Sequence, residues 1–284
     1  MALPPPSESA TALVTGASAG IGEAIARELA SRGHGVTLVA RREERLSDLA
    51  GELSERHGVR AEAIAADLGD AAARERLAAQ IEGLGLEVEI LVNNAGFGGA
   101  GTVASADRER LLAMLRLNCE ALLDLQARYL PAMVARRRGV VINIASTAAF
   151  QPIPGTATYA ATKAFVLSLS EAVHEELKGT GVTLTAVCPG TVRTEFMRVA
   201  GIEQAEEQLP GVFWMRRAAL WGRGVAVWSS EAVAKAAVDA AENGKRAIVP
   251  GLLNRAGALT GQHAPRMLAI AKRLWRQALP ASAR

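Results

Sequence analysis

The stretch TALVTGASAGIG, residues 11–22, decides the fold of this 284-residue chain. Its first half is a short β-branched and aliphatic run that predicts a buried strand, and a helical pattern follows over 20–32. Between them Gly16 permits a tight turn, while Gly20 and Gly22 permit a close backbone approach. The helix start adds unpaired N–H groups and the positive end of the helix dipole, both of which attract a phosphate. A glycine-rich turn alone is a weak signal, but its place after the first strand predicts a nucleotide site.

The rest of the chain repeats this alternation of strand and helix. Further strands are expected at 35–40, 59–67, 88–94, 139–146, 181–190 and 246–251, and further helices at 43–57, 70–82, 107–137, around Tyr159 and at 232–242. Strands without polar–apolar alternation, separated by helices, indicate a parallel sheet covered on both faces. The predicted fold class is therefore α/β, a single domain with a doubly wound parallel sheet of about seven strands in an α/β/α sandwich. In such sheets ligands bind beyond the carboxyl ends of the strands.

Composition and charge exclude several classes of protein. Half of the residues (50%) are hydrophobic, and the net charge of +3 is too small to indicate a nucleic-acid partner. No apolar run approaches the roughly 20 residues of a spanning helix, and residues 1–9 lack the features of a signal peptide and are expected to be a disordered lead. Cys119 and Cys188 form neither a metal motif nor a disulfide framework, so we expect a cytoplasmic protein. No metal site is predicted, because the scattered histidines show no ligand spacing and are expected at the surface. They are His34, His57, His174 and His263.

The residues after the second strand favour one dinucleotide over the other. NAD-binding proteins usually place an acidic residue there, which accepts a hydrogen bond from the ribose 2′-hydroxyl. This strand instead ends in Arg41 and Arg42, whose guanidiniums can bind a 2′-phosphate with paired hydrogen bonds. The sequence therefore favours NADP(H) over NAD(H). The alternative is that both arginines are solvated residues at a helix start.

A second signal lies in TATYAATKAF, residues 156–165. Tyr159 and Lys163 stand four residues apart, so on a helix their side chains share a face. An ammonium near a phenol favours the phenolate, so we expect a lowered pKa for Tyr159 and a role in proton transfer near neutral pH. The alternative is an exposed tyrosine beside a solvated lysine.

Six motifs in sequence carry a family resemblance. They are TGASAGIG (15–22), Asp67, NNAG (93–96), Ser146, the Tyr159-x-x-x-Lys163 pair and PG (189–190). With these motifs in this order, the chain resembles the short-chain dehydrogenase/reductase family from about residue 10 to residue 251. The resemblance implies a Rossmann-type, NAD(P)-binding catalytic domain over 10–251.

The resemblance also implies four catalytic residues. Tyr159 is similar to the family's general acid or base, and Lys163 to its pKa partner, which also binds the nicotinamide ribose. Ser146 would hydrogen-bond the substrate oxygen. Asn118 would be the fourth member and would hold a water that passes protons to Lys163. Asn118 lies on the apolar stripe of its helix, where an amide needs partners, so a satisfied core asparagine is the alternative.

The glycine turn, the two arginines and the resemblance together predict the cofactor-binding residues. They are Gly16, Ser18, Ala19, Gly20, Ile21, Gly22, Arg41, Arg42, Asp67, Leu68, Asn94, Ala95, Gly96, Tyr159, Lys163, Pro189, Gly190, Val192 and Thr194. By the same analogy the helices around Asn118 and Tyr159 form a subunit interface, so a homodimer or homotetramer is expected.

Two segments have an unusual composition, the first rich in aromatic residues and the second in basic residues. The substrate loop, about 195–230, concentrates the bulky aromatics Phe213, Trp214, Trp221 and Trp228. This favours a lipophilic substrate, and the alternative is that the aromatics pack against the body or a partner. The extension 252–284 is basic and amphipathic, so peripheral membrane contact, a cap over the substrate cleft and packing on a neighbouring subunit all stay open.

The expected activity follows from the motifs and the resemblance. The chain is interpreted as an NADP(H)-dependent oxidoreductase that transfers a hydride between the nicotinamide and a ketone or secondary alcohol. The alternative is a regulatory or scaffold protein of the same fold that binds the cofactor without turnover. An epimerase or dehydratase acting on sugar nucleotides is ranked lower, because the chain after Pro189 leaves little room for a sugar-nucleotide domain.

Overall fold

A computed structural model describes residues 3–192, 195, 228–251, 254–255 and 258, which we call the described residues. They form one seven-stranded sheet in the order β3-β2-β1-β4-β5-β6-β7, and every neighbouring pair of strands is parallel. The strands are β1 (Ala10–Thr15), β2 (Val36–Ala40), β3 (Ala61–Ala65), β4 (Glu87–Asn93), β5 (Gly139–Ile144), β6 (Val182–Val187) and β7 (Ala247–Ile248). The predicted α/β fold class and its parallel sheet are confirmed.

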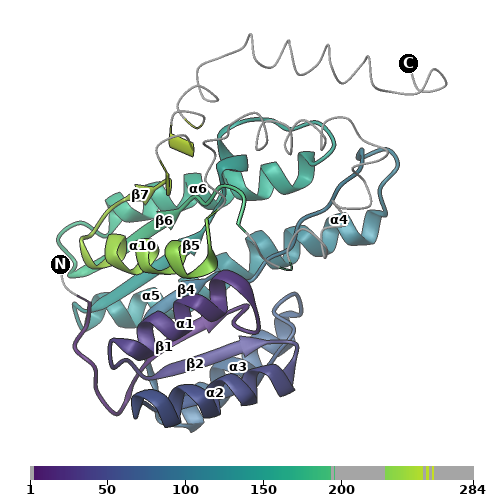
Figure 1. Ribbon diagram of the computed structural model, residues 1–284. Helices are drawn as coiled ribbons and strands as arrows, with labels where there is room; N and C mark the ends of the chain where they lie inside the picture. Colours follow the sequence, from purple (N-terminus) through teal and green to yellow (C-terminus); the bar gives the residue numbers. More distant parts are fainter. Residues whose placement is uncertain (1–2, 193–194, 196–227, 252–253, 256–257, 259–284) are drawn as a thin grey trace.

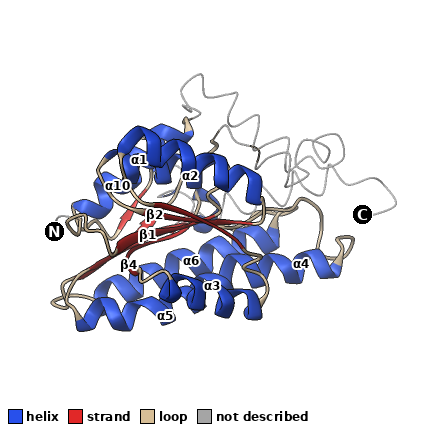
Figure 2. Ribbon diagram, turned by 90° about the horizontal axis from the view of Figure 1, so that it is seen from below, coloured by secondary structure: helices blue, strands red, loops and turns tan. Residues whose placement is uncertain are grey.

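Helices cover both faces of this sheet, as the view from below shows (Figure 2). α1, α2 and α10 lie on one face, and α3, α4, α5 and α6 lie on the other. The helices are α1 (Gly20–Ser31), α2 (Glu43–His57), α3 (Ala71–Gly83), α4 (Arg108–Leu115), the π-helical turn η1 (Arg116–Glu120), α5 (Ala121–Ala135), the 3₁₀ turn η2 (Thr147–Phe150), α6 (Ala157–Glu176) and α10 (Ser230–Glu242). The predicted sandwich is therefore present within the described residues (Figure 1).

The central strands of the sheet lack alternation because both of their faces are buried. On β1, Leu13 and Val14 are both 0% exposed, yet they belong to different cores. Val14 packs with Ile25 and Leu29 of α1, whereas Leu13 packs with Leu125 of α5 on the opposite face. A strand between two helical layers is buried on both faces, which explains the nearly continuous apolar run in the sequence.

The chain topology places the site. From β1 the sheet grows first through β2 and β3 on one side, and it then continues with β4 on the other side. This reversal is the switch point of a doubly wound sheet, so a crevice is expected outside the carboxyl ends of β1 and β4. The glycine turn follows β1, and Asn94 follows β4.

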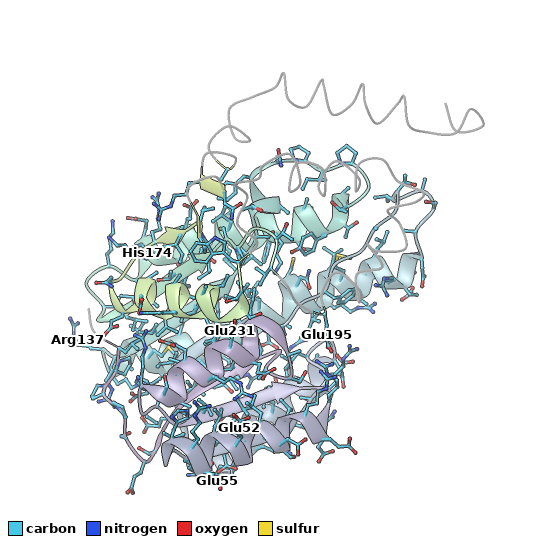
Figure 3. The ribbon with its side chains drawn as sticks, in the orientation of Figure 1. Glu52, Glu55, Arg137, His174, Glu195 and Glu231 are labelled. Carbon is cyan, nitrogen blue, oxygen red and sulfur yellow. The ribbon has the colours of Figure 1, made fainter. Side chains whose placement is uncertain are left out.

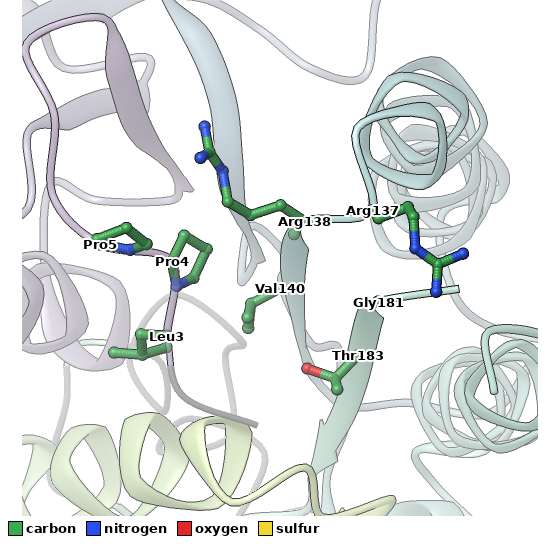
Figure 4. A pocket seen from close by; sticks show the side chains of 9 residues that line it. Leu3, Pro4, Pro5, Arg137, Arg138, Val140, Gly181 and Thr183 are labelled. Carbon is green, nitrogen blue, oxygen red and sulfur yellow. The ribbon is translucent and has the colours of Figure 1, made fainter. Parts of the chain in front are cut away.

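Three expectations need correction. The single helix expected over 107–137 is divided by η1, which contains Asn118. The lead, expected to be disordered, packs with Leu3 and the buried Pro4 against the amino ends of β5 and β6, because its apolar residues cover that end of the sheet (Figure 4). His34, expected at the surface, is buried, and burial lowers its pKa, with a smaller contribution from the Arg32 charge. Within the described residues no helix is long and apolar enough to cross a membrane.

Candidate active site

The glycine turn after β1 is tied to the end of β4 by hydrogen bonds. The Thr15 hydroxyl donates to the Val92 carbonyl (3.0 Å) and accepts from the backbone N–H groups of Asn94 (2.9 Å) and Ala95 (3.0 Å). The Asn94 side-chain amide donates in turn to the carbonyls of Thr15 (2.9 Å) and Gly16 (3.2 Å). The two strand ends at the switch point therefore hold each other in register.

This turn leaves no room for side chains. Gly16 has a φ of +66°, and a Cβ there would lie 2.7 Å from the Asn94 amide nitrogen. A Cβ on Gly22 would lie closer than 3.0 Å both to that nitrogen and to the Gly16 carbonyl oxygen. Ala19, the N-cap of α1, has no side-chain oxygen to cap the first N–H groups. The backbone N–H groups at Gly20 and Ile21 thus start a bare helix end that fits an anionic group such as a dinucleotide pyrophosphate.

A cationic cluster lies beside this turn. Arg42 donates through Nε (3.1 Å) and Nη2 (2.9 Å) to the Ser18 hydroxyl, and its Nη2 also reaches the Ser18 carbonyl (3.2 Å). Its Nη1 pairs with the Glu195 carboxylate at 2.8 Å, and Arg45 pairs with the same carboxylate at 3.3 Å. Arg41 is exposed and makes no hydrogen bond or ion pair within the described residues. The cluster therefore fits a phosphate close to the glycine turn.

Sequence reasoning missed Arg45. Arg42 and Arg45 are three residues apart at the start of α2, a spacing that puts both side chains on one helix face. That spacing was the available signal. The predicted role of Arg41 in binding the 2′-phosphate is not tested by the geometry and stays a prediction.

Ser146, Tyr159 and Lys163 come together at the carboxyl end of β5. Ser146 follows β5 and caps η2, with its hydroxyl accepting from the Ala148 N–H at 3.1 Å. The Ser146 and Tyr159 side chains share a hydrogen bond. Lys163, one turn further along α6, donates from Nζ to the Ile144 carbonyl at 2.7 Å, and Nζ lies 5.9 Å from the centroid of the Tyr159 ring. The alternative of an exposed pair is wrong, since Lys163 is only 6% exposed and Tyr159 is partly buried.

The protonation of this pair differs from the expectation. Burial raises the pKa of Tyr159 to about 12, and the hydrogen bond with Ser146 opposes this shift. Burial also lowers the pKa of Lys163 to about 8. The prediction that the pKa of Tyr159 is lowered is therefore wrong. Burial disfavours the charged phenolate by more than the hydrogen bond with Ser146 favours it. At neutral pH the site thus presents a neutral phenol beside an easily deprotonated ammonium.

Asn118 lies in η1, with 1% of its surface exposed. Its Oδ1 accepts from the Phe97 N–H (3.1 Å), and its Nδ2 donates to the Phe97 carbonyl (3.0 Å) and to the Thr162 hydroxyl (3.1 Å). A Cβ on Gly96 would lie 2.9 Å from this Oδ1 and 3.7 Å from the Lys163 Nζ. The side chain is therefore satisfied by the protein, in line with the satisfied-core alternative, and it also borders Lys163. Single π turns of this kind occur often at functional sites.

Further predicted cofactor residues within the described part of the chain follow the carboxyl ends of β3 and β6. Asp67 and Leu68 follow β3, where the Asp67 carboxylate accepts from the Gly69 N–H at 3.0 Å. Pro189 follows β6, and its carbonyl accepts from the Thr147 N–H at 2.9 Å. Together with the glycine turn and Asn94, these residues lie along the edge of the sheet formed by the carboxyl ends of its strands. A Cβ on Gly190 would lie 2.6 Å from the Asn254 amide nitrogen.

The predicted substrate loop is described only at its two ends. Val192 forms a parallel bridge with Trp228, and Trp228 packs against the core that contains α1 and α10. For Trp228 the packing alternative therefore holds. Thr194 and the other loop aromatics lie outside the described residues, as does most of the extension 252–284.

Comparison with known proteins agrees with this fold. A family model described as short chain dehydrogenase matches residues 10–205. The chain is 36% identical over 200 residues to the very-long-chain 3-oxoacyl-CoA reductase of Anas platyrhynchos. The aligned residues make up 69% of this chain and 64% of that protein. It is 41% identical over 189 residues to the NADP-dependent 3-hydroxy acid dehydrogenase of Salmonella typhi, covering 66% of this chain and 75% of that protein. The solved short-chain dehydrogenase from Sphingobium yanoikuyae in complex with NADPH superimposes with a TM-score of 0.74 at 34% identity, covering 91% of this chain and 94% of that one.

Proposed function

This chain belongs to the short-chain dehydrogenase/reductase family, and from that premise we propose that it moves a hydride between NADP(H) and a lipophilic ketone or secondary alcohol. The observation that carries the proposal is the grouping of the Tyr159 phenol, the Ser146 hydroxyl and the Lys163 amine at the end of β5. The grouping lies at the same edge of the sheet as the glycine turn, whose uncapped helix start suits an anion. An anion site and a proton donor at one sheet edge suit hydride transfer from a dinucleotide.

Tyr159 would act as the general acid in reduction. A phenol with its pKa raised to about 12 keeps its proton at neutral pH and can give it to a carbonyl oxygen. The nicotinamide, when bound, supplies the hydride that the carbonyl carbon receives. Ser146 would donate a hydrogen bond to the same carbonyl oxygen and help to hold it.

Lys163 would support the phenolate that Tyr159 becomes. With a pKa of about 8 the amine is mostly protonated at neutral pH, so its charge stabilises the phenolate. The same lowered pKa makes it a good proton donor to the phenolate after each turnover. Asn118, which borders Lys163 across Gly96, would keep this wall of the site in place.

The cofactor is assigned to the glycine turn and the cationic cluster. Gly16 to Gly22 would hold the pyrophosphate, and Arg42 with Arg45 would hold the 2′-phosphate that distinguishes NADP(H) from NAD(H). The relative from Salmonella typhi is described as NADP-dependent, and the neighbour from Sphingobium yanoikuyae is a complex with NADPH. Both support this choice of dinucleotide.

The substrate class is narrowed by the relatives. One is described as a 3-oxoacyl-CoA reductase and another as a 3-hydroxy acid dehydrogenase, and these names share an oxygen at the carbon β to a carboxyl group. We therefore assign a lipophilic 3-oxoacyl compound, reduced to the 3-hydroxyacyl compound, as the substrate. The aromatic content of the substrate loop is in line with an apolar acyl chain. The cytoplasmic location and the homodimer or homotetramer stay predictions.

The test is a substrate screen with both reduced dinucleotides. The protein is mixed with NADPH or NADH and a series of 3-oxoacyl thioesters of increasing chain length, and the loss of nicotinamide absorbance is followed. Turnover with NADPH that rises with acyl length is expected. Small polar ketones preferred over every thioester would refute the substrate class, and bound NADPH without turnover on any carbonyl would favour the regulatory alternative.

The chain offers a matched control for the proposed acid. It contains two tyrosines, and Tyr129 lies on α5 away from the carboxyl end of β5. Tyr159→Phe should lose turnover by about 100-fold or more while keeping its affinity for NADPH, as expected when a general acid is removed. Tyr129→Phe should keep both. Equal effects of the two variants would remove Tyr159 from the mechanism.

A further inference from the structure

The cationic cluster beside the glycine turn already holds an anion of the protein's own. The Glu195 carboxylate pairs with Arg42 at 2.8 Å and with Arg45 at 3.3 Å, and Figure 3 shows Glu195 beside the carboxyl end of β2. The three side chains are 34–51% exposed, so the ion pairs lie at an open edge of the site. Glu195 comes from a segment 153 residues away from Arg42 in the sequence.

The geometry leaves Arg42 little capacity for a second anion. Its Nε and Nη2 are occupied by Ser18, and its Nη1 by the Glu195 carboxylate. A guanidinium presents its five N–H donors in one plane, and carboxylate and phosphate use that fork in the same way. A phosphate that binds Arg42 and Arg45 must therefore replace Glu195 or accept it as a like-charged neighbour.

The charges around the cluster strengthen this competition. The hydrogen bonds from Arg42 and then Arg45 hold the pKa of the Glu195 carboxyl below its ordinary value. Glu195 is therefore ionised at neutral pH and repels a second anion in the same place. Glu43 and Glu44 lie next to Arg42 and Arg45 in sequence but form no ion pair with either of them in the structure.

We infer that Glu195 is a specificity-determining residue that competes with the 2′-phosphate of NADP(H) for Arg42 and Arg45 and so weakens NADP(H) binding. The inference rests on the proposed use of NADP(H). A dinucleotide without a 2′-phosphate does not contest these guanidiniums, so Glu195 leaves its affinity unchanged. Arg42 and Arg45 favour NADP(H) over NAD(H), and Glu195 makes this preference smaller than the two arginines would make it without Glu195.

The experiment measures binding without turnover. Dissociation constants of NADPH, NADH, adenosine 2′,5′-bisphosphate and ADP are determined by calorimetric titration for the wild type, Glu195→Gln and the control Glu44→Gln. Glu195→Gln should bind the two 2′-phosphorylated probes about three- to tenfold more tightly, the range expected when two partly exposed ion pairs are removed. NADH and ADP should bind as they do to the wild type, and Glu44→Gln, which removes the same charge from a neighbouring position, should change none of the four affinities by more than about twofold.

A double-mutant cycle separates competition from a general charge effect. In an Arg42→Ala, Arg45→Ala background the gain from Glu195→Gln should disappear, because the contested guanidiniums are gone. Weaker or unchanged NADPH binding in Glu195→Gln would overturn the inference and leave the proposed function standing. Failure of the wild type to bind either dinucleotide would overturn both.

Discussion

The lysine of the site should make the folded protein less stable at neutral pH. Lys163 is 6% exposed, and its charged amine donates to the Ile144 carbonyl at 2.7 Å. Burial lowers its pKa from the ordinary value of 10.5 to about 8. The variant to compare is Lys163→Met, which keeps the length of the apolar stem and removes the charge.

The direction of the pH effect follows from proton binding. Between pH 8 and pH 10.5 the unfolded wild type keeps its proton on Lys163, whereas the folded protein has lost it. The unfolded state then binds one more proton, so the free energy of unfolding rises with pH by about 1.4 kcal/mol per pH unit. Over the whole window the wild type should gain about 3 kcal/mol relative to Lys163→Met. Titrating groups that do not interact with Lys163 cancel in the difference, whereas Cys119 and Cys188, whose pKa values burial raises and the Lys163 charge lowers, cancel only in part.

The assay is urea unfolding of both proteins at pH values from 7 to 10.5, followed by far-UV circular dichroism. The exposed Lys245 gives the control, since Lys245→Met should show a difference from wild type that stays within about 0.5 kcal/mol across the same pH range. A constant difference between the wild type and Lys163→Met would refute the reasoning. It would mean that burial does not penalise this amine, and the proposed role of Lys163 as a ready proton donor would lose its basis.

Four further predictions concern the turn, the cofactor and the fold. Gly22→Ala should lower the free energy of unfolding by about 3 kcal/mol and weaken NADPH binding, because its Cβ meets the Gly16 carbonyl. Gly51→Ala, at an exposed position in the middle of α2 where a Cβ would meet nothing within 4 Å, should instead raise the free energy of unfolding by about 0.5–1 kcal/mol in the same urea unfolding assay. Arg42→Ala should weaken NADPH binding at least tenfold with little change for NADH, and equal losses in titrations of both would count against the 2′-phosphate assignment. Arg74→Met should lower the free energy of unfolding by about 2 kcal/mol in urea unfolding, because Arg74 is 3% exposed and joins α3 to Glu120 of η1 and Asp124 of α5.

Much of the fold could be predicted from the sequence because its signals are local. Leu13 and Val14 belong to a continuous apolar run, and such a run between helical patterns is typical of a strand in a parallel sheet with two covered faces. The break in the helix at η1 could not be predicted in this way. It coincides with the hydrogen bonds between Asn118 and the backbone of Phe97, which are contacts between segments 21 residues apart.

Some features of the candidate site could be predicted from the sequence and others could not. The glycine turn and the shared helix face of Tyr159 and Lys163 could be predicted from the sequence, because backbone freedom and helical periodicity depend on neighbours in the chain. Arg45 was missed although its spacing from Arg42 was visible, since nothing in the sequence linked it to Glu195.

By itself the sequence determined the order of most strands and helices, and it located the glycine turn and the Tyr159–Lys163 pair, to which we assign phosphate binding and proton transfer. Only the tertiary structure decided that Tyr159 holds its proton while Lys163 releases its proton easily, and that Glu195 reaches Arg42 across 153 residues. The physical reason is that spacing along a chain sets which neighbours share a face, whereas desolvation and ion pairing depend on which distant segments pack together.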